Sequence, residues 1–370
     1  MNDQPLKIAF DAKRLFSNYT GLGNYSRTLV RNLVKFFPRH EYHLFTPVVE
    51  KNTETAFFFE QKNIHIHSPG KTNKFLWRTF LQSALINKIN PDIYHGLSHE
   101  IPFGLDARIV KVVTFHDLIW ELYPQQFGWF DRKSYHFRYQ SSARRADHLL
   151  AISNNTKEDL INLYQIPSHK ISVIYQSCGS YFQTPTFYQG PKKHFLYVGS
   201  IIPRKGLDKI IMAYALLPDG EKRGVKIVGS GKGVYFDKCK SLIEYYHLEN
   251  HFSFLGGLAN NDLATLYDES IALVFPSIYE GFGIPVIEAI HRGCSVITSN
   301  KSSLPEAAVA ISTLVDPEDI HDITRAMRLS ILHANVPAKE EIDQALLPFS
   351  DEVTASKLMK LYLDLGARKL

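Results

Sequence analysis

The chain has 370 residues, of which 45% are hydrophobic and 21% are charged, and its formal net charge is +5. These values describe a folded globular chain long enough for two hydrophobic cores, and they exclude a disordered or low-complexity protein. A mildly basic balance without a known binding motif argues against a nucleic-acid partner.

Short apolar strands alternate with amphipathic helices along the chain, the pattern of parallel sheets with helical crossovers. The expected strands of the first half are Lys7–Phe10, Tyr42–Thr46, Ile64–His67, Ile93–His95, Ile109–Thr114, His148–Ile152 and Ile171–Tyr175. Glycines and prolines interrupt this rhythm over residues 178–193, which we interpret as a linker. The expected strands of the second half are His194–Val198, Val225–Val228, Phe252–Leu255, Ile271–Phe275, Ser295–Thr298 and Thr313–Val315. A final amphipathic helix is expected over Asp351–Leu365.

Three cysteines lie far apart in the sequence and form no CxxC pair. They indicate neither a disulfide framework nor a zinc site, and they favour a reducing cytoplasm. The polar first residues do not resemble a signal peptide, and no apolar run approaches the roughly 20 residues of a membrane-spanning helix. We therefore expect a cytoplasmic protein, with peripheral membrane contact as a further option.

A glycine-containing segment, Tyr19–Tyr25, leads into a helix expected to run to about Phe36. Such a loop can cradle phosphate. It does not match the dinucleotide fingerprint, because Ser26 stands where GxGxxG requires glycine. An ordinary glycine-containing helix entry is the alternative interpretation.

Histidines follow two neighbouring strands of the first half. His116 comes directly after the strand Ile109–Thr114, and His95 and His99 end the preceding one. Open α/β sheets bind ligands at the carboxyl ends of their strands, so His116 is placed to hydrogen-bond a sugar hydroxyl or to stabilise developing charge. A purely structural histidine is the alternative.

In the second half, the first strand is followed by Gly199–Gly206, which contains Arg204 and Lys205. Two cations at this position can neutralise a diphosphate. A solvated basic turn is the alternative. The segment Gly229–Gly233 is also rich in glycine, but it matches neither P-loop nor dinucleotide spacing, and we interpret it as a turn.

The most informative segment joins the strand Ile271–Phe275 to a helix. Gly281 and Gly283 allow a sharp turn and a close approach to a ligand, and Pro285 suits the first turn of a helix. Glu280 lies before the turn and Glu288 in the helix. A carboxylate accepts hydrogen bonds from two hydroxyls at once, as the 2′ and 3′ hydroxyls of a ribose require, and a helix N-terminus attracts diphosphate.

This segment reads E-G-F-G-I-P-V-I-E-A and resembles the signature of the retaining glycosyltransferases of family 4. The resemblance covers nearly the whole chain and implies a GT-B fold, with two facing Rossmann-like domains and parallel sheets. It implies an N-terminal acceptor domain at 1–180 plus 350–370, a donor domain at 190–349, and a C-terminal helix that crosses back to the first domain.

The resemblance also implies roles for individual residues. His116 and Glu280 are expected at the catalytic centre, and Tyr25 and His95 on the acceptor side. The expected donor-binding residues are Gly21, Gly23, Arg204, Lys205, Leu255, Gly281, Phe282, Gly283, Ile284, Pro285 and Glu288. Many family members carry arginine where this chain has Ser200, which puts one phosphate contact in doubt, and Arg204 is a candidate substitute.

The implied reaction moves a hexose from a nucleoside diphosphate sugar to a hydroxyl of a glycan or lipid-linked oligosaccharide, with retention of configuration. The chain contains no Asp-x-Asp pair, so we expect neither a metal nor another cofactor. Similarity to mannosyltransferase-like members that build bacterial surface polysaccharides favours GDP-mannose, with UDP-hexoses as the alternative.

Basic residues interleaved with aromatics favour contact with anionic lipid or with acceptor phosphates, and ordinary amphipathic helices are the alternative. These basic residues are Lys71, Lys74, Arg78, Arg132, Lys133, Arg138, Arg144 and Arg145. A non-catalytic sugar-nucleotide-binding subunit and a nucleotide-sugar epimerase are alternative functions. The missing GxGxxG counts heavily against a nicotinamide-dependent oxidoreductase.

Overall fold

The computed structural model describes residues 4–70, 77, 81–183, 188, 190–309, 311–332 and 338–367. The chain divides into two compact units. Met1–Ser177 with Pro348–Leu370 form the N-terminal unit, and Cys178–Leu347 form the C-terminal unit.

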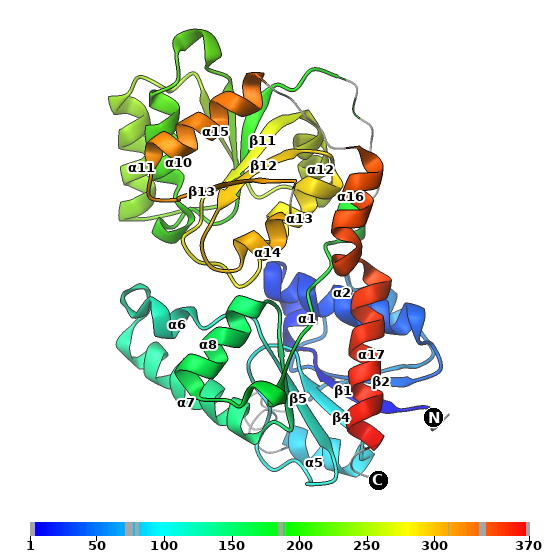
Figure 1. Cartoon of the computed structure of the whole chain (residues 1–370). Helices are drawn as coiled ribbons and strands as arrows, with labels where there is room; N and C mark the ends of the chain where they lie inside the picture. The colour runs from blue at the N-terminus through cyan, green and yellow to red at the C-terminus, as the bar shows by residue number, and fades with distance from the viewer. Residues whose placement is uncertain are drawn as a thin grey trace. The chain divides into compact units, whose positions relative to one another are not determined.

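The N-terminal unit is built on a seven-stranded parallel sheet with the order β3-β2-β1-β4-β5-β6-β7. Its strands are β1 (Lys7–Asp11), β2 (Glu41–Phe45), β3 (Ile64–His67), β4 (Ile93–Gly96), β5 (Val110–Phe115), β6 (His148–Ala151) and β7 (Ile171–Val173). Its helices are α1 (Lys13–Ser17), α2 (Gly21–Phe36), α3 (Phe57–Glu60), α5 (Gln82–Ile89), α6 (Ile119–Leu122), α7 (Trp129–Arg145), α8 (Asn154–Tyr164) and α17 (Asp351–Ala367). The C-terminal helix α17 packs against α2 within this unit (Figure 1).

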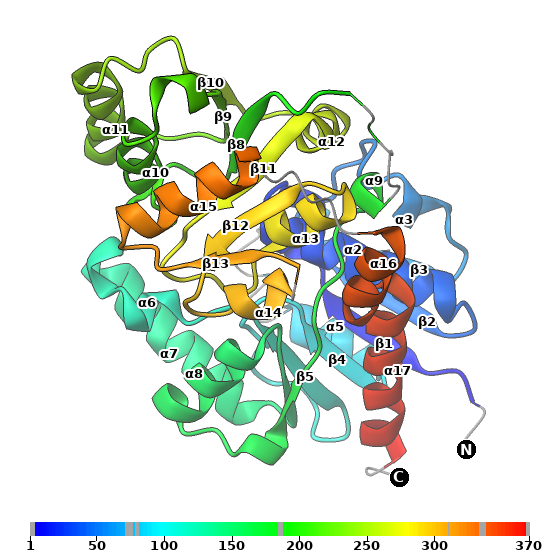
Figure 2. The same cartoon turned by 45° about the horizontal axis from the view of Figure 1, so that its top comes forward.

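The C-terminal unit is built on a six-stranded parallel sheet with the order β10-β9-β8-β11-β12-β13 (Figure 2). Its strands are β8 (His194–Val198), β9 (Gly224–Val228), β10 (Phe252–Gly256), β11 (Ser270–Phe275), β12 (Ser295–Ser299) and β13 (Thr313–Val315). Its helices are α9 (Ser180–Gln183), α10 (Leu207–Ala215), α11 (Val234–Tyr245), α12 (Asn260–Glu269), α13 (Ile284–His291), α14 (Leu304–Ala308), α15 (Ile320–Leu332) and α16 (Lys339–Leu346).

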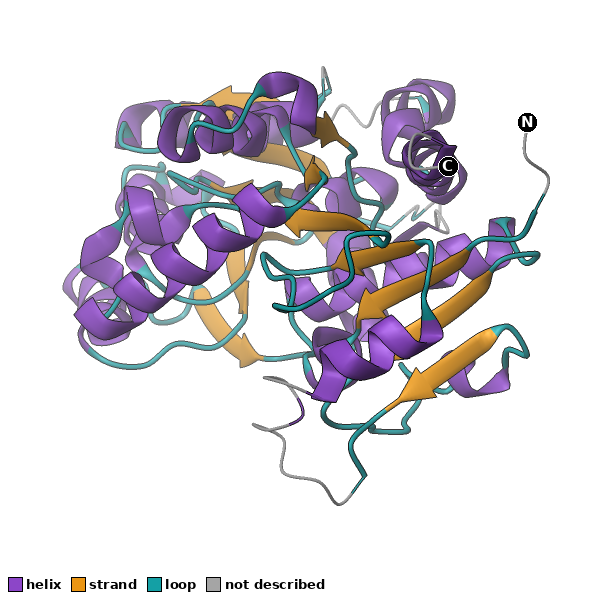
Figure 3. Cartoon of the chain, turned by 90° about the horizontal axis from the view of Figure 1, so that it is seen from below, coloured by secondary structure: helices purple, strands orange, loops and turns teal. Residues whose placement is uncertain are grey.

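Figure 3 shows the strands of each unit flanked by helices, the arrangement that buries both faces of a parallel sheet. The central strands β8 and β11 are accordingly near-continuous apolar runs in which every residue is buried, whereas the edge strands β3 and β10 also carry exposed residues. All thirteen expected strands are confirmed, with ends that differ by at most two residues. The expected C-terminal helix is confirmed as α17.

One local expectation is wrong: residues 21–25 are not a loop, because α2 begins at Gly21. Gly23 lies in its first turn, where a Cβ atom would stand 1.7 Å from the carbonyl oxygen of Asn18. The glycine therefore serves the close packing of α2 against the preceding chain rather than loop flexibility.

The described helices include none that is both long and apolar enough to cross a membrane. Cys178, Cys239 and Cys294 are all buried free thiols.

Candidate functional site

The turn between β11 and α13 has the geometry that its glycines predict. Gly283 is the N-cap of α13 with φ +113°, a left-handed conformation that favours glycine, and a Cβ there would stand 2.7 Å from the side chain of Leu304. Pro285 occupies the first turn of the helix. The free N–H groups and positive dipole end of α13 therefore point back toward the loop that carries Glu280.

Glu280 is the centre of a compact polar cluster in this loop. Its Oε1 lies 2.9 Å from Arg204 Nη1 and 2.9 Å from Lys205 Nζ, and it accepts a hydrogen bond of 2.8 Å from the Ser277 hydroxyl. Burial raises the pKa of this carboxyl, but Lys205 and Arg204 outweigh burial, so the pKa is lowered and the group stays ionised. The structure gives Oε2 no partner among the described residues, which leaves that oxygen available for ligand hydroxyls.

Arg204 also fixes the backbone of the same loop. Its Nη1 donates 2.8 Å to the carbonyl of Tyr279, and its own carbonyl accepts 2.9 Å from the N–H of Ile278. The hydroxyls of Ser302 and Ser303, which precede α14, both donate to the carbonyl of Glu280, at 2.8 and 2.7 Å. Sequence reasoning missed these two serines, because no motif connects them to the loop.

Glu288 is 8% exposed, and its Oε2 accepts a hydrogen bond of 2.9 Å from Tyr267 on α12. Burial raises the pKa of this carboxyl to about 7, and the bond from Tyr267 opposes the shift. Sequence reasoning also missed Tyr267, which stands 21 positions earlier in the chain.

Further expected donor-binding positions lie nearby in the fold. Leu255 is half-buried near the carboxyl end of β10, beside Gly256, whose carbonyl accepts 2.8 Å from the N–H of Gly229 after β9. Phe282 is buried in the loop before α13, and Ile284 is half-buried in the first turn. The carboxyl edge of this sheet thus brings together the β8, β10 and β11 ends, where ligands of open α/β sheets bind.

In the N-terminal unit, His116 lies just after β5 and is 5% exposed. Its Nε2 lies 2.9 Å from the carbonyl oxygen of Leu97, and its ring packs edge-on against Tyr25 with centroids 4.6 Å apart. Burial lowers the pKa of the imidazole to about 4. A neutral ring facing a carbonyl must carry its proton on Nε2, so Nδ1 is the hydrogen-bond acceptor.

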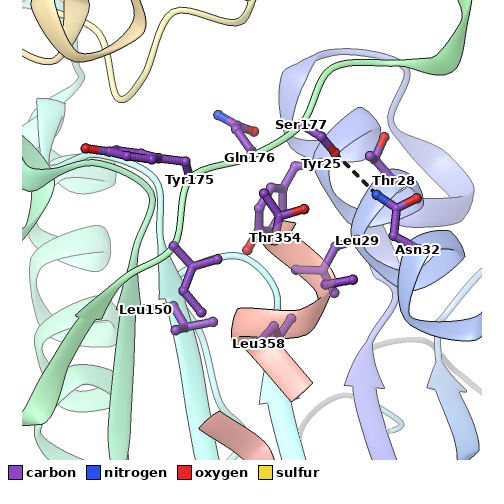
Figure 4. A pocket seen from close by; sticks show the side chains of 12 residues that line it. Tyr25, Thr28, Leu29, Asn32, Leu150, Tyr175, Gln176, Ser177, Thr354 and Leu358 are labelled. Atoms are coloured by element: carbon purple, nitrogen blue, oxygen red, sulfur yellow. Dashed lines mark hydrogen bonds between the residues drawn. The ribbon is translucent and has the colours of Figure 1, made fainter. Parts of the chain in front are cut away.

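Tyr25 and His95, expected on the acceptor side, belong to a buried hydrogen-bond chain. His95 is fully buried between the Tyr362 hydroxyl on α17, at 2.5 Å, and Thr114 Oγ1, at 2.7 Å. The Tyr25 hydroxyl lies 3.1 Å from the same Thr114 oxygen. Tyr25 also borders a small pocket between α2, the segment after β7 and α17, where Asn32 Nδ2 donates 3.3 Å to Ser177 Oγ (Figure 4).

A larger pocket, of about 360 Å³, lies at the carboxyl edge of the N-terminal sheet. Asp11 and Glu100 line it, both tied to Lys13 by ion pairs of 2.8 Å. Phe103, which is 57% exposed, stands in its wall with the Arg145 guanidinium 3.9 Å from its ring centroid. The Arg145 group also donates to the carbonyls of Ile101 and Pro102. Carboxylates and an exposed aromatic ring match the hydroxyls and the apolar face of a sugar.

The expected basic surface is described only in part. Lys71, Lys74 and Arg78 lie outside the described residues. On α7, Trp129 and Phe130 are 57% and 81% exposed, and Lys133 Nζ lies 5.0 Å from the Trp129 ring centroid. These aromatics and cations are therefore accessible on one helix.

Comparison with known proteins gives matches in both units. A family model described as Glycosyltransferase Family 4 matches residues 19–177, and one described as Glycosyl transferases group 1 matches residues 184–343. O-antigen chain mannosyltransferase B of Escherichia coli is 27% identical over 354 residues, which cover 86% of this chain and 89% of that protein. O-antigen chain mannosyltransferase RfbU of Salmonella typhimurium LT2 is 31% identical over 211 residues, 56% of this chain and 57% of that protein.

Among solved structures, HepE of Anabaena in complex with UDP and glucose superposes with a TM-score of 0.71, at 15% identity, over 96% of this chain and 99% of that chain. The two parallel-sheet units are thus those of the GT-B fold.

Proposed function

Because the chain belongs to the group 1 glycosyltransferases of family 4, we propose that its C-terminal unit binds a nucleoside diphosphate sugar and that the protein transfers the hexose to a glycan hydroxyl. The observation that carries this proposal is the cluster of Glu280, Arg204 and Lys205, with contacts of 2.9 Å, at the N-terminal end of the helix that carries Glu288. This cluster combines what a sugar diphosphate needs, namely carboxylates for hydroxyls and cations for phosphate.

Each group has a definite part in the proposed reaction. Glu288 accepts the ribose hydroxyls through Oε1, which has no partner among the described residues, while Tyr267 holds Oε2. Glu280 accepts hydroxyls of the transferred sugar through Oε2. Lys205 and Arg204, held in place by Glu280 Oε1, stabilise the negative charge that develops on the departing diphosphate.

These cations supply the leaving-group stabilisation that a metal ion supplies in other transferases, which supports metal-independent transfer. In this proposal, the carboxylate oxygens without a partner among the described residues, Glu280 Oε2 and Glu288 Oε1, accept sugar and ribose hydroxyls rather than forming a covalent intermediate. Retention of configuration is proposed from the resemblance to the retaining glycosyltransferases of family 4, with front-face attack as the favoured route.

The acceptor sugar is assigned to the pocket of about 360 Å³ in the N-terminal unit. Tyr25 and His95 both contact Thr114 Oγ1, and Tyr25 packs against the His116 ring, so we assign them to positioning His116 and Thr114. Phe103, which is 57% exposed in the wall of this pocket, offers its ring to the apolar face of a sugar, beside the ion-paired carboxylates of Asp11 and Glu100. Trp129, Phe130 and Lys133 on α7 are the groups that would contact an anionic membrane if the acceptor is lipid-linked.

Two relatives named as O-antigen mannosyltransferases support mannose as the hexose, GDP-mannose as the donor and a role in bacterial surface polysaccharide synthesis. The test is a calorimetric titration with GDP, UDP, GDP-mannose and UDP-glucose, followed by a transfer assay with mannose-terminated oligosaccharides and NMR of the new anomeric centre. GDP-mannose binding that Glu288→Ala abolishes, with an α-linked product, supports the proposal. Preference for UDP-glucose would identify UDP-glucose rather than GDP-mannose as the donor. Binding of either nucleotide sugar without transfer to any acceptor would favour a non-catalytic sugar-nucleotide-binding subunit.

A further inference from the structure

A cluster of histidines lies at the edge of the N-terminal sheet, on strands that carry none of the residues assigned to donor or acceptor. Strand β3 is the edge strand and pairs with β2 in a register that sets His43 directly opposite His65. Directly paired residues point to the same face of a sheet, and so does Glu41, two positions before His43. One face of this edge therefore presents Glu41, His43 and His65 together.

The side chains confirm this grouping. The rings of His43 and His65 stack with centroids 4.8 Å apart, and one ligand-type atom from each of Glu41, His43 and His65 lies within 4.8 Å of the others. His43 Nε2 and Glu41 Oε2 are 3.7 Å apart. Tetrahedral metal ligands about 2.0 Å from an ion are roughly 3.3 Å apart, so small side-chain rotations would close the set around one ion.

His43 is 8% exposed, and its Nε2 is buried without a hydrogen-bond partner. Its other nitrogen, Nδ1, lies 3.0 Å from Nε2 of His67. The buried Nε2 without a partner is therefore a ring nitrogen that a metal ion could occupy.

The contact with His67 limits His43 Nε2 to two arrangements, which differ in the ring that carries the shared proton. When His43 Nδ1–H donates to His67 Nε2, the lone pair of His43 Nε2 points toward the Glu41 carboxylate, and two acceptors face each other. When the proton is instead on His67, His43 Nε2 carries a buried N–H that makes no hydrogen bond, because Glu41 Oε2 at 3.7 Å is too far away. A bound cation satisfies both acceptors in the first arrangement, and His67 then orients the ligand as outer partners of metal-binding histidines do.

We propose that Glu41, His43 and His65 bind one zinc-type divalent metal ion, with water in the fourth position. Two imidazoles and a carboxylate suit Zn²⁺, and a set of three protein ligands leaves one open coordination position. The ion would tie the edge strand β3 to its neighbour β2 through side chains on one face of the sheet. It acts on the stability of the N-terminal unit, and the donor site in the C-terminal unit does not require it.

The test is a zinc titration of chelator-treated full-length protein in competition with a chromophoric chelator. The wild type is expected to bind one equivalent of zinc. His65→Ala and Glu41→Gln should each lower the affinity for zinc by at least about tenfold. Both altered side chains are at least partly accessible, so neither variant depends on repacking a core. The matched control is His169→Ala, which removes an exposed histidine of the same unit and should leave the equivalent unchanged.

Two further measurements report on the same site. Zinc should raise the melting temperature of the wild type but not of His65→Ala, because a ligand of the folded state alone stabilises it. His67→Ala should weaken zinc binding by about 10- to 100-fold through loss of the outer contact. The proposal is overturned if the wild type binds no zinc at micromolar concentrations, or if His65→Ala and His169→Ala bind zinc equally.

Discussion

The hydroxyl of Tyr267 donates a hydrogen bond of 2.9 Å to Oε2 of Glu288 inside the C-terminal unit. This bond holds one oxygen of a buried carboxyl and leaves the other for a ligand. Burial nevertheless raises the pKa of Glu288 to about 7. Ionisation of this carboxyl, which is proposed to bind the ribose hydroxyls, therefore lowers the stability of the ligand-free protein.

That cost can be measured as stability. The unfolded pKa is near 4.5 and the folded pKa about 7, so the penalty is absent below pH 4.5, grows as pH rises between the two values and is complete above pH 7. Glu288→Gln keeps an acceptor for Tyr267 and removes the charge. We expect it to raise the free energy of unfolding by up to about 3 kcal/mol at pH 8 and to change it little at pH 4.5. Urea unfolding at both pH values checks this, and an equal effect at both would contradict the assignment.

The affinity for nucleotide should also depend on the ionisation of Glu288, but it should rise with pH where the stability of the ligand-free protein falls. Ribose hydroxyls donate to the ionised carboxyl, so affinity should rise with pH until about pH 7 and then level off. Tyr267→Phe removes the bond that opposes the shift, and its midpoint should lie at higher pH. Calorimetry between pH 5.5 and 8.5 gives the midpoints. Glu288→Gln serves as the control, since any remaining pH dependence in it belongs to the nucleotide or to other groups.

Lys205 should matter more for turnover than for donor affinity. Its Nζ lies 2.9 Å from Glu280 Oε1, and in the proposed reaction it faces charge that develops only as the diphosphate departs. Lys205→Met is expected to lower kcat by about 100- to 1000-fold, the cost of losing one preorganised charge-stabilising group. Lys240→Met on α11 is the matched control for loss of one exposed lysine. An unchanged kcat would remove Lys205 from the reaction.

His116 allows a test that separates its two nitrogens. Nε2–H is committed to the Leu97 carbonyl at 2.9 Å, so only Nδ1 can accept from a sugar hydroxyl. The amide of Asn reaches the place of Nδ1, whereas that of Gln reaches the place of Nε2. We expect His116→Gln to lower kcat/KM by about tenfold to 100-fold and His116→Asn to lose less. The reverse order would mean that the Leu97 contact, and not the free nitrogen, supports activity.

The sequence was sufficient for the strands because each is a short local pattern of β-forming residues, apolar throughout in the central strands and alternating in an edge strand such as β3. It also placed Glu280, Gly283 and Pro285 correctly around one turn, since these residues act within ten positions of one another. It did not predict that Tyr267 holds Glu288 or that Ser302 and Ser303 hold the Glu280 carbonyl, because those partners come from other helices and loops.

The interpretations of the Gly21–Tyr25 segment and of His95 changed because both pack against other parts of the chain. Gly21 and Gly23 were interpreted as part of a loop that can cradle phosphate, but they lie in the first turn of α2, where Gly23 packs closely against Asn18. His95 looked accessible at a strand end, yet Tyr362 arrives from α17, 267 positions away, and buries it. A strand-end histidine cannot be distinguished from a core histidine until the distant helix is placed.

The acceptor pocket gives the last prediction. Phe103 is 57% exposed, and the Arg145 group beside it already donates to the carbonyls of Ile101 and Pro102, so the ring is held in place before any sugar binds. Phe103→Ala should therefore raise the KM for acceptor several-fold, since stacking of this kind contributes about 1 kcal/mol, and should leave the Kd for donor nucleotide unchanged. Phe137→Ala, which removes another exposed phenylalanine of the same unit, is the control. Initial rates at varied acceptor concentration distinguish the outcomes: a lower kcat at unchanged KM would place the ring outside acceptor binding, and an altered donor Kd would indicate that the unit had rearranged.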